Sequence, residues 1–225
     1  MENMQNRISR ILARIEQAAR KTGRNRDDIT LVAVSKMVDN TTVHQAYELG
    51  LRDFGENRVQ ELNRKMNSLP QARWHMIGRM QTNKVKDVVG RACLIHSLDR
   101  WALAEEINKR GRLLDLQVPV LLEVNISGEA SKAGFHANEV DSVLQSVGEL
   151  SHIQVMGFMT IAMQDDDPEI SRPVFRELTE LRNSLKGRKY QQVDLQYLSM
   201  GMSQDFEVAI EEGANIVRIG SALFI

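Results

Sequence analysis

Short apolar runs alternate with amphipathic stretches along almost the whole chain. The first amphipathic stretch spans residues 3–21, where Ile8, Ile11, Leu12 and Ile15 recur at helical spacing ahead of Gly23. Runs typical of β-strands then lie at residues 29–34, 53–55, 74–77, 94–97, 120–124, 153–158, 197–199 and 216–219. The stretches between them predict helices at residues 41–49, 58–66, 83–89, 100–110, 137–150, 172–185 and 203–212. This strict alternation predicts an α/β fold with a parallel sheet.

Two architectures fit these repeated units: a small (β/α)8 barrel and an open doubly wound sheet. An open nucleotide-binding sheet has its glycine-rich turn after the first strand. Here the first strand is followed by Lys36-Met37-Val38-Asp39-Asn40, and the glycines follow the last two strands, where barrels commonly bind phosphate. We therefore predict a single TIM barrel, one domain over residues 1–225. No full eighth helix is expected after the last strand, and the extra N-terminal helix is expected to cover that gap.

Charge and composition favour a small partner over nucleic acid or a membrane. The 225 residues include 29 basic and 30 acidic ones, so no overall field attracts nucleic acid or anionic lipid. No apolar stretch approaches the roughly 20 residues of a membrane span, and the first residues lack a signal-peptide apolar region. His75 and His96 end adjacent strands, but their spacing indicates polar packing or support of a site rather than metal binding. We expect a cytoplasmic protein without a metal.

Lys36 follows an apolar run and is the first candidate for chemistry. A lysine at the end of a strand is usually just solvated, so the residue alone carries little weight. In a barrel, active sites lie at the carboxyl ends of the strands, and alternation puts Val32, Val34 and Lys36 on one strand face. The amine would then reach the rim, where apolar neighbours or a nearby cation could keep it neutral for imine formation.

Two loops near the other terminus form a candidate anion site. They are Ser199-Met200-Gly201-Met202-Ser203 and Ile219-Gly220-Ser221. Their glycines permit close backbone approach, their serines offer donors, and Ser203 is expected to begin a helix whose free N–H groups face the site. Either loop alone is explained by a turn or a helix cap. Together, at the two expected strand ends, they predict a phosphate cup.

Arg218 lies two residues before Gly220 and on the same strand face as Ile216. An inward arginine needs a partner, and two remain open: the nitrogen of a pyridine ring, or a carboxylate such as that of Glu56. Closure of the barrel would place the first strand beside the last, and thus the Lys36 amine beside the cup. An amine, a phosphate cup and an inward arginine together suggest pyridoxal 5'-phosphate (PLP), whose ring nitrogen an arginine would leave unprotonated.

Several motifs spread over the chain occur together in one known family. They are Val34-Ser35-Lys36, Phe54-Gly55-Glu56-Asn57-Arg58-Val59-Gln60-Glu61, Trp74-His75-Met76-Ile77-Gly78, Ile95-His96-Ser97, Val124-Asn125, Ser199 to Ser203 and Val217-Arg218-Ile219-Gly220. With them the chain resembles the pyridoxal phosphate homeostasis proteins, whose fold is like the barrel domain of alanine racemase. The resemblance implies that Lys36 carries PLP as a Schiff base, that Arg218 faces the pyridine nitrogen, that Ser203, Gly220 and Ser221 hold the phosphate, and that Asn57 and Met200 lie near the ring.

Three functions compete at this point. The first is a monomeric binding protein for PLP homeostasis, which stores or delivers PLP. It would affect the balance of amino acids and keto acids, and PLP-dependent apoenzymes are its candidate partners. The second is a racemase-like PLP enzyme. Alanine racemases, however, take a second base from another domain and subunit, for which this chain has no residues left. The third, binding of another phosphorylated metabolite, leaves Lys36 unexplained. We expect PLP binding without efficient turnover.

Overall fold

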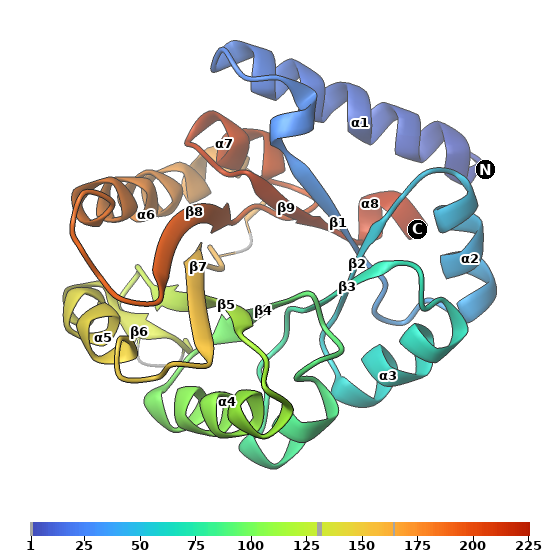
Figure 1. Cartoon of the computed structure of the whole chain (residues 1–225). Helices are drawn as coiled ribbons and strands as arrows, with labels where there is room; N and C mark the ends of the chain where they lie inside the picture. Colours follow the sequence, from blue (N-terminus) through green and yellow to red (C-terminus); the bar gives the residue numbers. More distant parts are fainter. Residues whose placement is uncertain (1, 130–131, 164) are drawn as a thin grey trace.

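Eight parallel strands close into a barrel in the computed structural model, which describes residues 2–129, 132–163 and 165–225 (Figure 1). The strands are β1 (Thr30–Val34), β2 (Asp53–Glu56), β3 (Arg73–Met76), β4 (Leu94–Leu98), β5 (Val118–Asn125), β7 (Ile153–Met159), β8 (Val193–Ser199) and β9 (Ile216–Ile219). Their order is β4-β3-β2-β1-β9-β8-β7-β5, and β5 pairs with β4 to close the ring. The short strand β6 (Phe135–His136) adds to β5 outside the barrel. The predicted TIM barrel is confirmed.

Helices surround this barrel as an outer ring (Figure 1). The α-helices are α1 (Met4–Lys21), α2 (Asn40–Glu48), α3 (Val59–Ser68), α4 (Trp101–Leu114), α5 (Val140–Val147), α6 (Arg172–Leu185), α7 (Phe206–Glu211) and α8 (Ser221–Phe224). Short 3₁₀ helices lie at Arg26–Asp28, Thr82–Asp87, Ala137–Glu139 and Pro168–Ser171. None of the helices in the described ranges is long and apolar enough to span a membrane.

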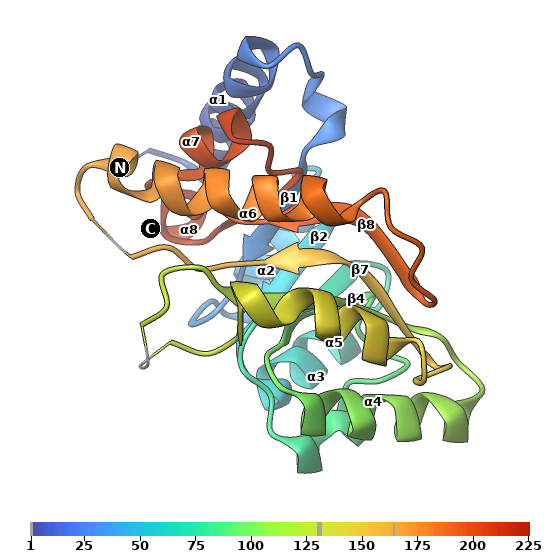
Figure 2. The same cartoon turned by 90° about the vertical axis from the view of Figure 1, so that its left-hand side faces the viewer.

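Helix α1 covers the sector of the barrel where the chain returns to its first strand. Its apolar stripe, including Ile11 and Ile15, is fully buried. Its polar side pairs with α7, where Arg14 makes a 2.7 Å salt bridge to Glu207, and Arg7 Nε donates to the carbonyl of Leu223 in α8 at 2.9 Å. Figure 2 shows α1 stacked over α7. The expected covering role of this helix is confirmed.

The helix predicted from Ser203 begins three residues later, at Phe206. A turn occupies the intervening residues because the Asp205 carboxylate accepts a hydrogen bond from the Met202 amide at 2.6 Å. Gly201, at φ 91°, brings the chain so close to α7 that a β-carbon there would lie 2.5 Å from the β-carbon of Ala209. The prediction that Ser203 starts the helix was therefore wrong, since a local carboxylate–amide bond stabilises the turn.

Two clusters of buried apolar residues form the core, and a group of polar residues lies at one end of the barrel. The larger cluster lies between strands and helices, and a smaller cluster of Val32, Leu94, Leu121, Met159 and Ile216 fills the barrel interior. The same inward alternation carries polar side chains to the carboxyl ends of the strands. On β9, for example, Arg218 follows Ile216 on the inward face and is in register with Val32 of β1. The barrel thereby places the candidate chemistry at one end.

Candidate functional site

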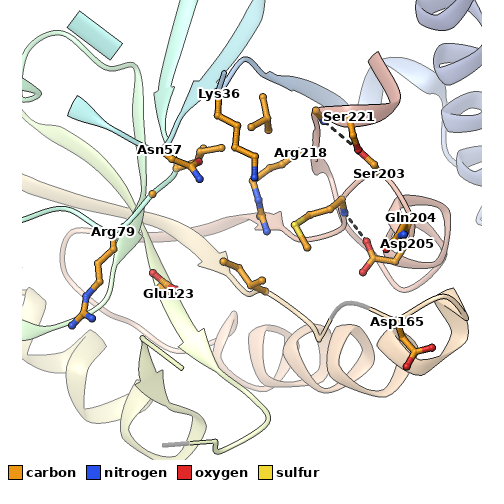
Figure 3. Close-up of a pocket in the computed structure, with 16 residues that line it drawn as sticks. Lys36, Asn57, Arg79, Glu123, Asp165, Ser203, Gln204, Asp205, Arg218 and Ser221 are labelled. Atoms are coloured by element: carbon orange, nitrogen blue, oxygen red, sulfur yellow. Dashed lines mark hydrogen bonds between the residues drawn. The ribbon is translucent and has the colours of Figure 1, made fainter. Parts of the chain in front are cut away.

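A cavity of about 440 Å³ opens at the carboxyl ends of the strands, a volume typical of small-molecule sites (Figure 3). Six of the seven residues expected at the site line it, namely Lys36, Asn57, Ser203, Arg218, Gly220 and Ser221. They come from the loops after β1, β2 and β8, from β9 itself and from the start of α8. Residues far apart in the sequence thus meet in one cavity, as barrel closure predicts.

Lys36 lies two residues beyond the end of β1 and extends its side chain into the cavity (Figure 3). The residue before it is fixed by a buried ion pair, because Lys65 Nζ donates to the Ser35 carbonyl at 2.6 Å and to Glu56 Oε1 at 2.5 Å. The Ser35 hydroxyl donates to the same carboxylate at 2.7 Å. These bonds anchor the base of the Lys36 loop while its amine stays accessible.

Glu56 therefore belongs to Lys65, and its proposed pairing with Arg218 was wrong. Arg218 instead donates to neutral oxygens: Nη1 to the Ser199 carbonyl at 2.7 Å and hydroxyl at 2.6 Å, and Nη2 to the Thr160 carbonyl at 2.9 Å. Burial lowers the pKa of its guanidinium to about 10, against the attraction of Glu123 and Asp205, so it remains a cation at neutral pH. Only three of its five N–H donors are used by these bonds, which leaves donors for a ligand.

The predicted cup is assembled around the Ser203 hydroxyl. The amides of Gly220 and Ala222 both point at Ser203 Oγ, each at the long distance of 3.4 Å. A β-carbon at Gly220 would lie 3.1 Å from the Val34 carbonyl, so glycine keeps this wall of the cup open beside β1. Two amides, two serine hydroxyls and a small residue match the needs of a phosphate group, whose oxygens accept several hydrogen bonds at close range.

Asn57 and Met200 have different positions relative to the cavity. Asn57 lines it, in contact with a neighbour that must be small, because a β-carbon at Gly78 would lie 2.4 Å from the Asn57 carbonyl. Met200 is fully buried in the core between barrel and helices, and Met202 lines the cavity in its place. The turn at Gly201 separates the two methionines and directs only the second toward the cavity.

Glu123 is a cavity residue that the sequence analysis missed. It lies on β5, two residues after the inward-facing Leu121, and the alternation of that strand could have identified it. Burial, together with the nearby Asp99, raises the pKa of its carboxyl to about 7. Asp99 itself is paired with Arg79 at 2.8 Å. The site therefore holds one carboxyl group whose charge changes near neutral pH.

Other polar residues at the cavity complete its rim. Gln204 and Asp205 lie next to Ser203, whereas Asp165 lies at the periphery (Figure 3). Within the described ranges, no group of three or more His, Cys, Asp and Glu residues is placed to hold a metal ion. The donors and charges of this cavity suit an organic phosphate that carries a group reactive toward an amine.

Comparison with known proteins places the chain among PLP-related barrels. Residues 7–225 match the family described as alanine racemase, N-terminal domain. A curated pyridoxal phosphate homeostasis protein of Aquifex aeolicus is 47% identical over 220 residues, which cover 97% of this chain and 96% of that protein. This likeness extends over nearly the whole chain.

Solved structures agree with this placement. PipY of Synechococcus elongatus, determined with PLP bound, superposes with a TM-score of 0.82 at 30% identity, covering 99% of this chain and 100% of its own. Alanine racemase of Corynebacterium glutamicum, at 15% identity and a TM-score of 0.70, shares the fold over 97% of this chain and 60% of its own. The chain belongs to the alanine racemase N-terminal domain family and, within it, to the pyridoxal phosphate homeostasis proteins.

Proposed function

We propose that this protein binds PLP in the cavity and that Lys36 carries it as a Schiff base. The observation that carries the proposal is the convergence of Lys36, Arg218 and the cup of Ser203, Gly220 and Ser221 on a single cavity. PLP, when bound, supplies an aldehyde carbon that reacts reversibly with amines. Relatives named for PLP homeostasis and the PLP-bound PipY structure support the choice of ligand.

Each cavity residue then has a distinct role. The serine hydroxyls and the amides of Gly220 and Ala222 hold the phosphate, and Arg218 donates a hydrogen bond to the pyridine nitrogen. Asn57 borders the ring; Met200 supports the loop from the core side. Because arginine keeps its own proton, the ring nitrogen stays unprotonated. Such an arrangement binds PLP, but the unprotonated ring nitrogen makes the ring a weak electron acceptor for carbanion chemistry.

We place the protein in intracellular PLP homeostasis as a monomer that stores PLP and delivers it. PLP-dependent apoenzymes are its candidate recipients, and the same amine chemistry would link it to the balance of amino acids and keto acids. The names of its relatives support this role. An accessible Lys36 at an open rim supports it as well, because a stored aldehyde must be reachable by an acceptor.

A racemase-like enzyme is the second candidate, and one observation favours it. Glu123 faces the same cavity with a pKa near 7, as a general acid or base requires. Against this stands the use of Arg218 as ring partner. The shared fold with alanine racemase carries no weight for catalysis, since folds host many functions.

The test is reduction of the PLP-loaded protein with borohydride followed by peptide mass spectrometry. We expect one pyridoxyl group on Lys36, none in Lys36→Ala, and an unchanged result in Lys86→Ala, whose exposed lysine lies outside the cavity. Pyridoxal without phosphate should bind at least tenfold more weakly, because hydrogen bonds to a charged group contribute roughly 1.5–3 kcal/mol each. An adduct on another lysine would refute the role of Lys36, and equal affinity for the two compounds would refute the cup.

A further inference from the structure

A chain of buried hydrogen bonds runs through the barrel interior and ends on Arg218. Arg218 Nη1 lies 2.6 Å from Ser199 Oγ, which lies 2.9 Å from His96 Nδ1. His96 Nε2 lies 2.9 Å from His75 Nδ1, and His75 Nε2 lies 3.0 Å from Asp53 Oδ1. The chain thus crosses β9, β8, β4, β3 and β2. Ser199 and His96 are fully buried, and the other members are at most 7% exposed.

The two ends of this chain determine its direction. Arg218 can only donate, so Ser199 Oγ accepts from it and has its own hydrogen left for His96 Nδ1. At the other end, Asp53 remains a carboxylate, because hydrogen bonds from Arg73 and His75 hold its pKa below the usual value in spite of burial. An ionised carboxylate only accepts, so His75 Nε2 donates to it. Each bond then has one donor and one acceptor only if both histidines carry their hydrogen on Nε2.

Other protonation patterns leave the chain unsatisfied. A second proton on His75 would turn its Nδ1 into a donor and push the hydrogen of His96 onto Nδ1. Ser199 Oγ would then receive two donors, and its own hydrogen would lose its acceptor within a buried site, which is unfavourable. Full burial also holds the pKa of His96 well below its ordinary value, and the positive charge of Arg218 acts in the same direction. A neutral, unidirectional chain is the arrangement that the geometry favours.

We propose that Asp53, His75, His96 and Ser199 are positioning residues, which orient Arg218 so that its free N–H donors face the cavity. Arg218 has no carboxylate partner in hydrogen-bond contact among the described residues, so neutral oxygens alone fix its plane. The Ser199 hydroxyl is the one acceptor that could rotate away. The histidines hold it in place, since they are themselves tied to Asp53. This inference rests on the proposed function only in naming the pyridine nitrogen as the group that Arg218 meets.

The first test needs no cofactor. Nitrogen NMR of the histidine side chains in the purified protein reports the tautomer of each ring. We expect His75 and His96 both as neutral rings with hydrogen on Nε2. A hydrogen on Nδ1 of either ring would overturn the proposed direction, whatever the protein binds.

The second test uses Ser199→Ala, which removes the link between Arg218 and His96 and keeps the backbone carbonyl. We expect PLP affinity to fall about three- to tenfold, the effect of one hydrogen bond, and the ring-nitrogen resonance of labelled PLP to shift. The matched control is Ser68→Ala, since Ser68 Oγ pairs with His44 Nε2 at 2.8 Å on the outer helices, away from the cavity. It should leave both readings unchanged.

The outcomes separate the inference from the proposed function. If wild-type protein does not bind PLP, the proposed function fails. The direction of the hydrogen-bond chain is then tested by the histidine tautomers alone. If wild-type protein binds PLP and Ser199→Ala retains both its affinity and its ring-nitrogen resonance, the positioning role is refuted. A shift in the resonance with the folded barrel intact supports it, because a merely structural serine would not alter the environment of the ring.

Discussion

Glu123 is a buried cavity residue whose pKa is set by burial and by its charged neighbours. Its carboxyl is buried at the end of β5, with Asp99 as a neighbouring negative charge and Arg218 as a nearby positive one. Burial and Asp99 outweigh the arginine, so the protonated form is favoured in the folded protein and the pKa is raised to about 7. In the unfolded chain the same group titrates near 4.5. Glu123 therefore links stability to pH.

Because ionisation of the buried Glu123 costs stability at higher pH, a substitution that cannot ionise should stabilise the protein there. Below about pH 4.5 Glu123 is protonated in both states; above about pH 7 the folded protein must ionise a buried group, at a cost of about 3 kcal/mol. Stability should thus fall as pH rises between these values. Glu123→Gln, which cannot ionise, should exceed wild type by up to about 3 kcal/mol near pH 8 and by less than about 1 kcal/mol near pH 5.

Urea unfolding at the two pH values measures this difference. Glu149→Gln is the control, because that glutamate is exposed and does not line the cavity. A gain in Glu123→Gln that is the same at both pH values would contradict the linkage.

At the residue scale, the sequence predicts best those residues whose chemistry depends on strand position. Lys36 and Arg218 were located by alternation within their own strands, and the cup by glycine and serine after two strands. Glu123 satisfied the same rule but had no motif to draw attention to it. The partner of Glu56 could not be predicted, because Lys65 reaches it from a helix, and strand alternation says nothing about which helical side chain turns inward.

At the element scale, the loop that carries Lys36 depends on contact between β1, β2 and α3. Lys65 and Glu56 are both at most 1% exposed, and together they bind the Ser35 backbone and hydroxyl. Such a pair is expensive to break on one side, because the remaining charge stays buried without a partner. The positions of most helices and strands were predictable from periodicity, but β8 begins at Val193, four residues before the predicted strand, and the helix predicted at residues 83–89 is a 3₁₀ helix over Thr82–Asp87. The late start of α7 was not predictable, because Asp205 binds a backbone amide locally in a way that periodicity does not reveal.

Breaking the buried pair on one side should therefore destabilise the whole barrel. Lys65→Met leaves Glu56 buried alone and should lower the free energy of unfolding by about 3–5 kcal/mol. Adding Glu56→Gln removes the orphaned charge while an acceptor for Ser35 remains, and should restore part of the loss. The matched control is Arg64→Ala, which breaks the exposed pair with Glu61 on the same helix and should cost far less, because solvent screens an exposed pair. Equal losses in Lys65→Met and Arg64→Ala would disprove the importance of burial.

At the scale of the whole molecule, closure of the barrel converts separate sequence signals into one site. Pairing of β1 with β9 puts the Lys36 loop beside Arg218 and the cup, although nearly the full length of the chain separates them. Alternation of elements alone also fitted an open doubly wound sheet, and the glycine and serine loops after the last two strands favoured the closed barrel. Arg218 is a cation at neutral pH, and Glu123 is the cavity's one carboxyl with a pKa raised to about 7 among the described residues.

We therefore expect the PLP-loaded protein to be a poor amino acid racemase. Efficient PLP-dependent racemases rely on their protein to tune the ring and to place a base on each side of the reacting carbon. Arg218 would leave the ring nitrogen unprotonated and so a weak acceptor of electrons, and among the described residues of the cavity Glu123 is the one carboxyl group with a pKa raised to about 7. The measurement is exchange of the α-proton of alanine in heavy water, with free PLP and Lys36→Ala protein as controls. Turnover should stay well below about 1 per second, the lower end of ordinary enzymes. Turnover above that value, abolished in Glu123→Gln, would establish the racemase-like alternative with Glu123 as its base.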